Sequence, residues 1–515
     1  MKTQPVGVPL PHQSVWAATV ERPMFSPLEG NIRTDVCVIG AGIAGLTTAY
    51  ELIQAGKNVV VLDDGPLAGG MTEATTAHLT CAIDDRYCAI ERWHGQEGAR
   101  LTAQSHSAAI DRIEEIAKNE AIDCDFQRVD GYLFWPSRLH DDMLREEMEA
   151  AHRAGLTDVV KVDRAPFESF ESGPALRFPR QGQFHPLKYL LGVTGAIMRD
   201  GGRIYCNTHA DTIEGGDAAK VTTGNSVVHC DAIVVATNTP INDLLVIHTK
   251  QAGYMTYVIG AKIPPGHVER ALYWDTENPY HYVRVQPVQK NGEEYELLIV
   301  GGEDHKSGQA EDTGERHQRL ETWARARFKA MGEIEFTWAG EVRETTDGLA
   351  FIGRNPLDKK NVFIVTGDSG MGMTHGTIAG MLLKDMILGK ENPWEKLYDP
   401  SRITLSASGN YARETLNMMA QYRDWFTAGD VESVDAIEKG TGAILRRGMK
   451  KIAAFRDETG TIHEMSAVCP HLGGIVRWNP TEKTWDCPCH GSRFKETGAV
   501  MMGPANTNLA PIKDD

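Results

Sequence analysis

The segment from Thr34 to Asp64 constrains the fold of this chain more than any other part of the sequence. It begins with an apolar run, residues 35–39, of the kind that forms a buried parallel strand. Glycines follow in the spacing G-x-G-x-x-G, and residues 46–55 then suit a helix that Gly56 ends as a C-cap. A second apolar run, residues 59–62, completes a strand–helix–strand unit. The segment therefore predicts a nucleotide-binding α/β domain.

Each glycine of the motif has a physical role in such a unit. Gly40 permits the tight turn, Gly42 lets the backbone approach a pyrophosphate, and Gly45 lets the helix pack close to the strand. Asp63 stands where an acidic side chain accepts hydrogen bonds from a ribose. A glycine-rich turn of another α/β fold is the alternative, but strand, helix and acid all stand where dinucleotide binding needs them. The motif alone does not distinguish FAD from NAD.

Length and composition exclude several classes of protein. The chain has 515 residues, enough for more than one domain, and its formal net charge of −17 argues against binding to nucleic acid or anionic lipid. No apolar run is long enough to cross a membrane, and the first residues lack the apolar core of a signal peptide. The nine cysteines are scattered apart from the last three, so we expect a reducing, cytoplasmic location without a disulfide framework.

A second sheet is predicted in the middle of the chain. Residues 254–263, 280–287 and 295–301 are strand-like runs that are too long and too mixed for the nucleotide-binding sheet. An antiparallel sheet is the simplest account of them. Residues 311–331 are predicted to form an amphipathic helix. The expected fold class is therefore α/β, with a Rossmann-type domain and an antiparallel-sheet substrate domain.

Three further stretches contribute to a family resemblance. Residues 65–80 form a small, hydroxyl-rich loop, residues 234–237 read Val-Val-Ala-Thr, and residues 367–374 read Gly-Asp-Ser-Gly-Met-Gly-Met-Thr. With the nucleotide unit they resemble the FAD-dependent D-amino-acid oxidase superfamily, in particular its glycine/D-amino-acid dehydrogenase-like branch, over roughly residues 31–400. The resemblance implies FAD as cofactor and oxidation of a C–N bond by hydride transfer to the flavin N5.

The residues expected to bind FAD lie in these stretches. They are Gly40, Gly42, Ile43, Ala44, Gly45, Asp63, Asp64, Gly70, Thr75, Thr76, Ala236, Thr237, Gly367, Asp368, Gly370, Met371, Gly372 and Thr374. The last stretch also predicts a helix N-terminus aimed at the flavin pyrimidine ring, where it would stabilise negative charge on the reduced cofactor.

Substrate-binding residues are expected in the antiparallel sheet. An amino-acid substrate needs a guanidinium for its carboxylate, and Arg284 lies in a predicted strand beside Tyr282. Arg343 stands close to where the superfamily often places an arginine. A surface ion pair is the alternative for either arginine. Some relatives attach FAD covalently through a histidine in the region of His78, but we expect no covalent bond here.

The C-terminal region carries a second chemical site. Cys469-Pro-His471 is followed by Cys487-Pro-Cys-His490, and C-x-H with C-x-x-H is the ligand set of a Rieske [2Fe–2S] centre. The two cysteines would hold one iron as thiolates, and the two histidines would hold the other through imidazole nitrogens. A structural zinc ion also accepts two cysteines and two histidines, but zinc sites more usually pair the cysteines in one loop and the histidines in another. We therefore expect a Rieske cluster in an all-β domain.

The second loop resembles that of cytochrome bc-type Rieske proteins, with two departures. In that family a disulfide joins the extra loop cysteine, here Cys489, to the first loop, where this chain has Gly474. We therefore expect Cys489 to be a small, packed thiol. Ser492 is retained as a donor to a bridging sulfide, but Phe494 stands where the family often has a tyrosine. Fewer donors predict a reduction potential below the bc-type range.

The predicted domains are partly discontinuous. They are an N-terminal arm, 1–30; an FAD-binding domain, 31–95, 180–245 and 345–400; a substrate domain, 96–179 and 246–344; a helical linker, 401–430; and the Rieske domain, 431–515. One helical face of the linker is expected to pack between the modules, with a partner- or membrane-facing surface as the alternative. This face consists of Tyr411, Thr415, Met418, Met419, Tyr422, Trp425 and Phe426.

Two redox centres on one chain predict a converter between two-electron and one-electron chemistry. We expect FAD to take a hydride from an amine or amino acid, including an N-methylated one, and the cluster to pass single electrons to an external carrier. The alternative is inward flow from the cluster for oxygen activation at the flavin, and the sequence does not fix the direction. A redox-responsive binding protein is the non-enzymatic alternative, which the intact loops at both sites disfavour.

Overall fold

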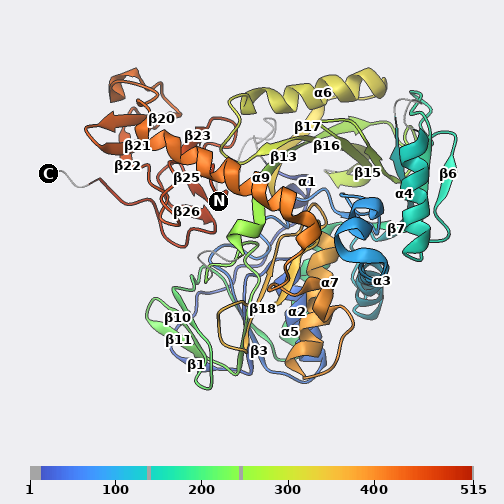
Figure 1. Cartoon of the computed structure of the whole chain (residues 1–515), viewed down its shortest axis with the longest axis horizontal. Coiled ribbons are helices and arrows are strands. Elements are labelled where there is room, and N and C mark those ends of the chain that lie inside the picture. Colours follow the sequence, from blue (N-terminus) through green and yellow to red (C-terminus); the bar gives the residue numbers. More distant parts are fainter. Residues whose placement is uncertain (1–12, 136–140, 243–246, 291, 513–515) are drawn as a thin grey trace.

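The computed structural model describes residues 13–135, 141–242, 247–290 and 292–512. These residues form a nucleotide-binding half, a large second sheet and a C-terminal β domain, which a long linker helix connects to the rest (Figure 1). The first twelve residues of the predicted N-terminal arm lie outside the described residues.

A six-stranded sheet forms the centre of the nucleotide-binding half. Adjacent strands in this sheet are parallel, except that β18 and β19 at one edge are antiparallel. In spatial order the strands are β18 (Phe351–Arg354), β19 (Val362–Thr366), β12 (Ala232–Val235), β2 (Val36–Ile39), β3 (Val59–Leu62) and β8 (Arg203–Tyr205). The two strands predicted from the apolar runs of the nucleotide unit are confirmed, and both are buried throughout because each face of the sheet is covered.

Different layers cover the two faces of this sheet. Val38 and Val61 share a core with helices α2 (Ile43–Gln54) and α7 (Gly372–Ile387), and α5 (Pro186–Arg199) joins the same layer. Ile39 and Leu62 point the other way and pack against a small four-stranded sheet. That sheet consists of β1 (Ile32–Arg33), β11 (Ser226–His229), β10 (Lys220–Thr223) and β9 (Thr212–Glu214).

The predicted antiparallel sheet is confirmed and is larger than expected. Its main path is β17 (Ile334–Thr345), β13 (Gln251–Ile263), β16 (Glu293–Lys306), β15 (His281–Lys290), β14 (Leu272–Asp275), β5 (Gln127–Phe134), β7 (Ala175–Gln183) and β4 (His78–Leu79), and β6 (Val160–Val162) pairs with β7. Since β4 belongs to this sheet and β7 crosses residue 180, the sheet extends across the predicted domain boundaries.

The helix predicted over 311–331 is shorter in the structure. Helix α6 spans Arg316–Arg327 and lies along the large sheet (Figure 1). Thr313–Glu315 form a 3₁₀ turn, and Phe328 leaves the helical conformation with φ −103° and ψ 85°. The remaining helices are α1 (Val15–Ala18), α3 (Tyr87–Asn119, kinked at Gly95), α4 (Asp141–Arg153), α8 (Glu395–Tyr398) and α9 (Ser408–Gln421).

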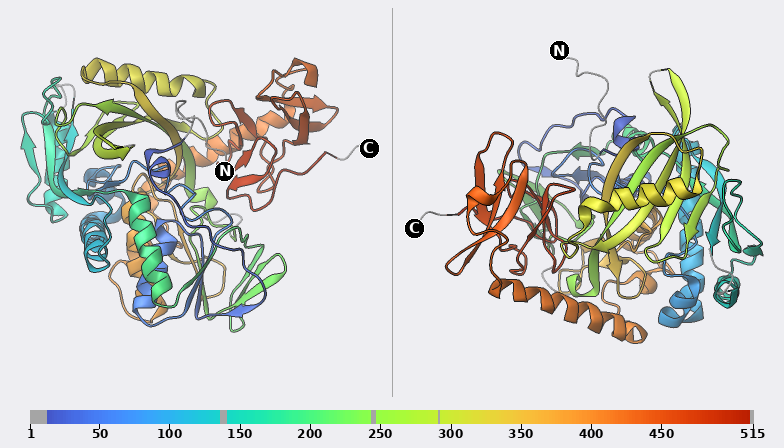
Figure 2. Two further views of the ribbon diagram at one scale, coloured as in Figure 1. Left: turned by 180° about the vertical axis from the view of Figure 1, so that it is seen from behind. Right: turned by 90° about the horizontal axis from the view of Figure 1, so that it is seen from above.

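The C-terminal domain is all-β, as predicted, and Figure 2 shows it beside the large sheet at the end of α9. Its first sheet contains β20 (Thr441–Arg447), β21 (Lys450–Arg456) and β22 (Ile462–Ser466). Its second contains β23 (Arg477–Asn479), β24 (Thr484–Asp486), β25 (Arg493–Lys495) and β26 (Val500–Met502). No helix among the described residues is both long and apolar enough to cross a membrane.

A buried ion pair fixes the start of the linker to the nucleotide-binding half. Arg402 contacts both carboxylate oxygens of Asp347 at 2.8 Å and also donates to the carbonyl of Ala350 at 2.7 Å. The Arg402 side chain is 9% exposed and that of Asp347 is 3% exposed. The charges hold the pKa of Asp347 below its ordinary range, although burial alone would raise it.

We predict that Arg402→Met lowers the free energy of unfolding by about 3–5 kcal/mol, because it leaves a buried carboxylate without its partner. Urea denaturation measures this loss. The matched control is Arg354→Met, which removes an exposed ion pair with Glu395 and is expected to cost at most about 1 kcal/mol. Equal losses in the two variants would contradict the importance of the buried pair.

Candidate active site and metal centre

Close backbone contacts shape the glycine-rich turn after β2. Gly40 has a φ of +104°, and a Cβ built on it would lie 2.4 Å from the carbonyl oxygen of Ala236. A Cβ on Gly45 would lie 1.8 Å from the carbonyl oxygen of Gly40. Neither position leaves room for a side chain, so α2 starts directly against the sheet.

The N-terminus of α2 presents backbone donors beside an acidic side chain. Gly42, the N-cap residue, has no side chain to occupy the first N–H groups, and the N–H of Ile43 donates to Thr72 Oγ1 at 3.1 Å. Asp63 accepts hydrogen bonds from the N–H groups of Ala41 and Gly65, at 2.6 and 2.8 Å. Burial raises the pKa of Asp63. Donors at a helix N-terminus suit a pyrophosphate, and an acid at this strand end suits a ribose.

A cavity of about 900 Å³ opens next to this N-terminus. Its volume falls within the range of about 300–1,000 Å³ that small-molecule and cofactor sites occupy. Most of the residues predicted to bind FAD line it, namely Gly40, Gly42, Ile43, Ala44, Asp63, Asp64, Gly70, Thr75, Thr76, Ala236, Thr237, Gly367, Asp368, Gly370, Met371 and Gly372. Gly45 and Thr374 are buried behind this wall, where Thr374 Oγ1 contacts the Met371 carbonyl at 3.1 Å. The cradle and its donors therefore fit FAD.

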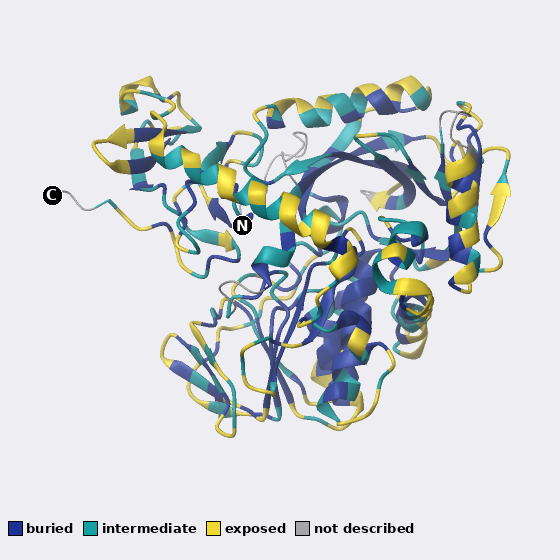
Figure 3. Cartoon of the chain, viewed as in Figure 1, coloured by how far each residue is buried: buried dark blue, intermediate teal, exposed yellow. Residues whose placement is uncertain are grey.

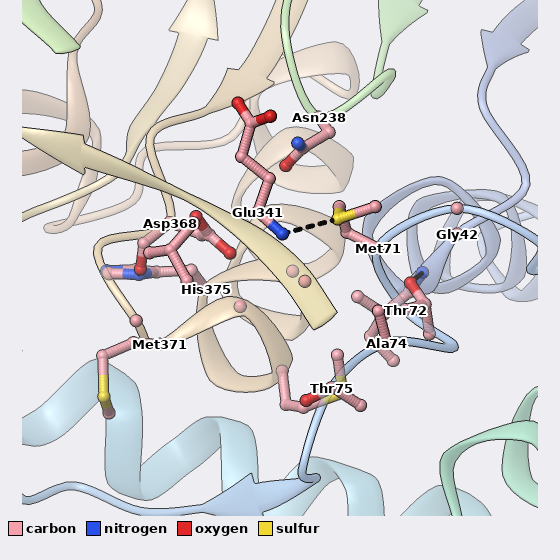
Figure 4. A pocket seen from close by; sticks show the side chains of 18 of the residues that line it. Gly42, Met71, Thr72, Ala74, Thr75, Asn238, Glu341, Asp368, Met371 and His375 are labelled. Carbon is pink, nitrogen blue, oxygen red and sulfur yellow. Dashed lines mark hydrogen bonds between the residues drawn. The ribbon is translucent and has the colours of Figure 1, made fainter. Parts of the chain in front are cut away.

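The second glycine loop forms the opposite wall of the cavity. In Figure 4, Asp368, Met371 and His375 lie across the cavity from Gly42 and Thr72. His375 Nδ1 is 2.9 Å from the carbonyl oxygen of Asp368, and burial lowers the His375 pKa to about 4. His375 is therefore a neutral side chain that holds the loop at the start of α7.

Carboxyl groups line the part of the cavity that adjoins the large sheet. They include Asp84, Asp85, Asp304, Glu344 and Asp368. Burial raises their pKa values, to about 6 for Asp84 and Asp368, to about 7 for Asp85 and Asp304, and well above the ordinary value for Glu344. Repulsion from neighbouring carboxylates adds to the rise for Asp85, Asp304 and Glu344. Asp84 has accessible surface, which it contributes to the cavity wall.

Cationic side chains are scarce in the same wall. Among the described residues that line the cavity, only Arg86 and Lys495 carry a guanidinium or ammonium group. Arg86 lies next to Asp85 in the sequence and partly offsets the repulsion there. The cavity therefore presents an excess of acidic groups to a bound molecule.

The two arginines predicted to bind a substrate carboxylate are not part of the cavity wall. Arg284 is completely buried, and its Nη1 donates to the carbonyls of Thr76, Ala77 and Phe184 at 3.1, 2.8 and 3.3 Å. It supports the threonine loop from behind, because backbone oxygens occupy the donors that a substrate would need. Arg343 points toward the C-terminal β domain instead. In this structure both arginines therefore make buried contacts with backbone carbonyls.

Tyr282 does line the cavity, as part of a small polar and aromatic cluster. Its hydroxyl lies 2.7 Å from Thr256 Oγ1. The ring of His78 lies 5.8 Å from that of Tyr282 and 5.7 Å from that of Trp274. Burial and the charge of Arg284 lower the pKa of His78 to about 3, so its imidazole is neutral. This group of side chains lies next to the carboxyl groups and provides hydrogen-bonding groups among aromatic rings.

Sequence reasoning predicted Asp368 but missed Asp84, Asp85, Asp304 and Glu344, and it missed the contact that Trp16 makes with the cofactor loop. Trp16 in α1 donates from Nε1 to the carbonyl of Thr75 at 2.6 Å and so packs the arm against the cofactor loop. Consecutive charges at Asp84, Asp85 and Arg86 were a signal in the sequence. Asp304 had none, since an acid in a strand of alternating type usually points toward solvent.

The four predicted cluster ligands come together at the ends of two loops in the β domain. The rings of His471 and His490 have centroids 4.9 Å apart, and the thiols of Cys469 and Cys487 are close neighbours. His490 Nε2 is buried and has no hydrogen-bond partner, as expected of an atom reserved for a metal. A thiol pair facing an imidazole pair fits a cluster in which each iron takes one pair.

Glycine at position 474 allows the two cluster loops to approach each other. A Cβ built on Gly474 would lie 2.6 Å from Cys489 Sγ and 3.1 Å from Cys487 Sγ. Cys489 is a free thiol in the structure. Ser492 Oγ accepts a hydrogen bond from the N–H of Ala505 at 3.0 Å, which ties the second loop to the end of the domain.

The cluster loops contact the flavin-binding part of the chain. Arg343 on β17 donates to the carbonyls of His490, Gly491 and Gly503 at 2.5, 3.3 and 2.7 Å, and it forms an ion pair with Glu341 at 2.7 Å. The Arg343 side chain is 1% exposed. Since Glu341 also lines the large cavity, a single ion pair joins the cavity wall to the backbone of a predicted cluster ligand.

The linker holds the first cluster loop. Tyr422 donates to the carbonyl of Leu472 at 2.7 Å, and Trp425 Nε1 donates to that of Gly473 at 2.9 Å. The predicted packing face is therefore only partly buried: Tyr411, Met419 and Phe426 are exposed, at 41%, 60% and 85%, and Figure 3 shows the exposed side of α9. The packing interpretation holds for Tyr422 and Trp425 and is wrong for these three.

This fold and these two sites define a flavoprotein oxidoreductase that carries an iron–sulfur centre. Residues 35–386 match the family described as FAD dependent oxidoreductase, DAO, and residues 424–513 match the Rieske [2Fe-2S] domain. The chain belongs to the FAD dependent oxidoreductase family, and its cofactors are FAD and a Rieske [2Fe–2S] cluster.

Similar proteins share this architecture in whole or in part. A Bacillus subtilis (strain 168) protein that bears the name Rieske 2Fe-2S iron-sulfur protein YhfW is 32% identical over 508 residues, 97% of each chain. Gamma-glutamylputrescine oxidoreductase of Escherichia coli (strain K12) is 27% identical and covers 71% of this chain and 86% of its own. The solved structure of glycine oxidase from Geobacillus kaustophilus superimposes with a TM-score of 0.58 at 16% identity, over 72% of this chain and 99% of its own, which shows the shared fold.

We predict that Cys487→Ala abolishes the Rieske-type EPR signal of the dithionite-reduced protein, because it removes a thiolate ligand. The matched control is Cys489→Ala, which removes a free thiol two positions along the same loop and is expected to retain the signal and the iron content. Loss of the signal in both variants would contradict the assignment of Cys489 as a non-ligand.

Proposed function

We propose that the chain dehydrogenates a cationic amine, one that carries a positive charge in addition to the reacting nitrogen, and that the electrons leave through its own Rieske cluster. The observation that carries the proposal is the charge of the cavity wall: its described residues include eleven aspartates and glutamates, but only Arg86 and Lys495 carry a guanidinium or ammonium group. An ammonium group compensates buried carboxylates, whereas a substrate carboxylate would add to their repulsion.

The carboxyl groups come from separate elements and converge on one region. Asp84 lies before α3, Asp304 on β16 and Glu344 on β17, and the charges of Asp84 and Asp304 both raise the pKa of Glu344. Tyr280 donates to Asp84 Oδ2 at 3.4 Å. This arrangement would hold an ammonium group, while Tyr282 and Thr256 would orient the uncharged end of the substrate. The neighbouring neutral His78 adds no positive charge.

Bound FAD supplies a two-electron hydride acceptor, and the cluster supplies one-electron transfer to an external one-electron carrier. The contacts of Arg343 support this order of centres, because they fix the backbone of His490 against a strand that also lines the flavin cavity. The substrate loses a hydride and the nitrogen becomes an iminium, so no side chain is required as a strong base.

The similarity to gamma-glutamylputrescine oxidoreductase supports an amine rather than a simple α-amino acid as substrate class. The name of that protein refers to a substrate with an aliphatic amine chain. In the present chain, the structural use of both Arg284 and Arg343 supports the same choice, since neither guanidinium reaches the cavity.

The first experiment is an anaerobic titration of the purified protein with pools of diamines, polyamines and amino acids, followed by absorption and EPR. Bleaching of the flavin band by amines, followed by a Rieske-type EPR signal, is the expected result. Bleaching by neutral amino acids alone would overturn the substrate class. The opposite direction of electron flow would be indicated if only an external reductant reduced the cluster, the flavin were reduced after it, and peroxide formed in air.

We predict that Asp304→Asn lowers kcat/KM for a cationic amine by about 10- to 100-fold, the loss expected when a charged hydrogen bond or ion pair to the substrate is removed. Steady-state kinetics with an artificial acceptor measures it. The control is Asp217→Asn, which changes an exposed aspartate outside the cavity wall and is expected to leave kcat/KM unchanged. A similar effect in both variants would contradict the role of Asp304.

The raised pKa values predict a pH dependence with a definite sign. Below about pH 6 the carboxyl groups are neutral and bind a cation weakly, and they ionise as the pH passes their pKa values of about 6 for Asp84 and about 7 for Asp304. We therefore expect kcat/KM to rise between pH 6 and 7.5, roughly in proportion to the ionised fraction. A pH profile that falls over this interval would contradict the proposal.

A further inference from the structure

The C-terminal β domain contributes part of the wall of the large cavity. Seven of the residues around this space belong to it, namely Lys495, Val500, Met501, Met502, Gly503, Ala505 and Asn506. They lie in β25, β26 and the segment that follows, far in sequence from the glycine motif. On the flavin-binding side, the same cavity is lined by Asp63, Asp64, His209, Thr237 and Asn238.

Direct contacts hold this segment against the flavin-binding half. Asn506 Nδ2 donates to the carbonyl of Ala210 at 3.4 Å, and Asn238 Nδ2 lies 3.7 Å from Met502 Sδ. Arg343 donates to the carbonyl of Gly503 at 2.7 Å. Each contact joins a residue of the C-terminal domain to a different element of the flavin-binding part, so the segment has a defined position over the cavity.

The same segment is also rigidly connected to the second cluster loop. Residue 493 on β25 pairs with Met502 on β26, and the N–H of Ala505 donates to Ser492 Oγ at 3.0 Å. Arg343 completes the connection, because it contacts both Gly503 and the carbonyl of His490. A displacement of the segment from the cavity would therefore also displace the cluster loop.

We propose that residues 500–506 of the Rieske domain form a structural wall of the FAD site, so that FAD is retained by the docked Rieske domain and in turn keeps that domain docked. A ligand that contacts two domains binds the docked state more tightly than the separated state. By linkage, the preference is reciprocal: docking slows the loss of FAD, and FAD stabilises docking. The proposal depends on the cofactor and not on the identity of the amine.

The test measures FAD release from the holoprotein, as the rise in flavin fluorescence after dilution into buffer with an excess of a flavin-binding trap protein. Met502→Ala and Asn506→Ala, made separately, are expected to accelerate release by about tenfold, since each removes a contact that closes the cavity. Met449→Ala is the matched control: Met449 lies in the same domain, is 89% exposed in the β20–β21 turn and is outside the cavity wall. It is expected to release FAD at the wild-type rate.

Two further readouts keep the result interpretable. An unchanged Rieske-type EPR spectrum and iron content establish that the domain of each variant is folded. In the wild-type protein, saturation with FAD is expected to slow hydrogen exchange of the backbone amides of residues 500–506, which uses no substitution. Wild-type FAD release in both folded variants, or hydrogen exchange in this segment that FAD does not change, would overturn the proposal.

Discussion

The interaction on which the two-centre arrangement depends is the buried contact set of Arg343. Its guanidinium forms an ion pair with Glu341 in the cavity wall and donates to three backbone carbonyls of the Rieske domain. Guanidinium donors are fixed in a plane and remain charged, so they need all of these acceptors when buried. If the domains separated, the Arg343 guanidinium would lose its three carbonyl acceptors and keep only Glu341 as a partner. Removing partners from a buried charge is costly, so these contacts favour the docked state.

Docking by this contact determines which faces of the cluster are available. The backbone of His490 is covered by β17, and the ring of His471 lies 4.9 Å from that of His248 in the flavin-binding part. The imidazole side of the cluster therefore faces the flavin half of its own chain. The linker covers another part of the first loop, where Tyr422 and Trp425 donate to its carbonyls.

The buried arginines and the cavity carboxyl groups lie in different surroundings. Both candidate arginines are occupied by backbone carbonyls, because a buried guanidinium needs acceptors and the loops around it supply them. The cavity receives carboxyl groups instead, and burial together with mutual repulsion raises their pKa values. An acidic cavity beside a flavin site thus arises from where each charged side chain finds its partners, and not from the overall charge of the chain.

The sequence by itself determined the features whose physics is local. Gly45 is required by a contact within one strand–turn–helix unit, and Gly40 by the turn itself, where its φ is +104°. Cys469 and His471, like Cys487 and His490, are brought together by short loops, so spacing alone revealed them. The apolar runs likewise predicted the buried strands. Only the tertiary structure showed where Arg343, Asp304 and residues 500–506 lie, because each of them meets a group more than a hundred positions away in the sequence. Arg343 and His490 are 147 residues apart in the sequence. No periodicity or motif in either segment predicts that they are in contact.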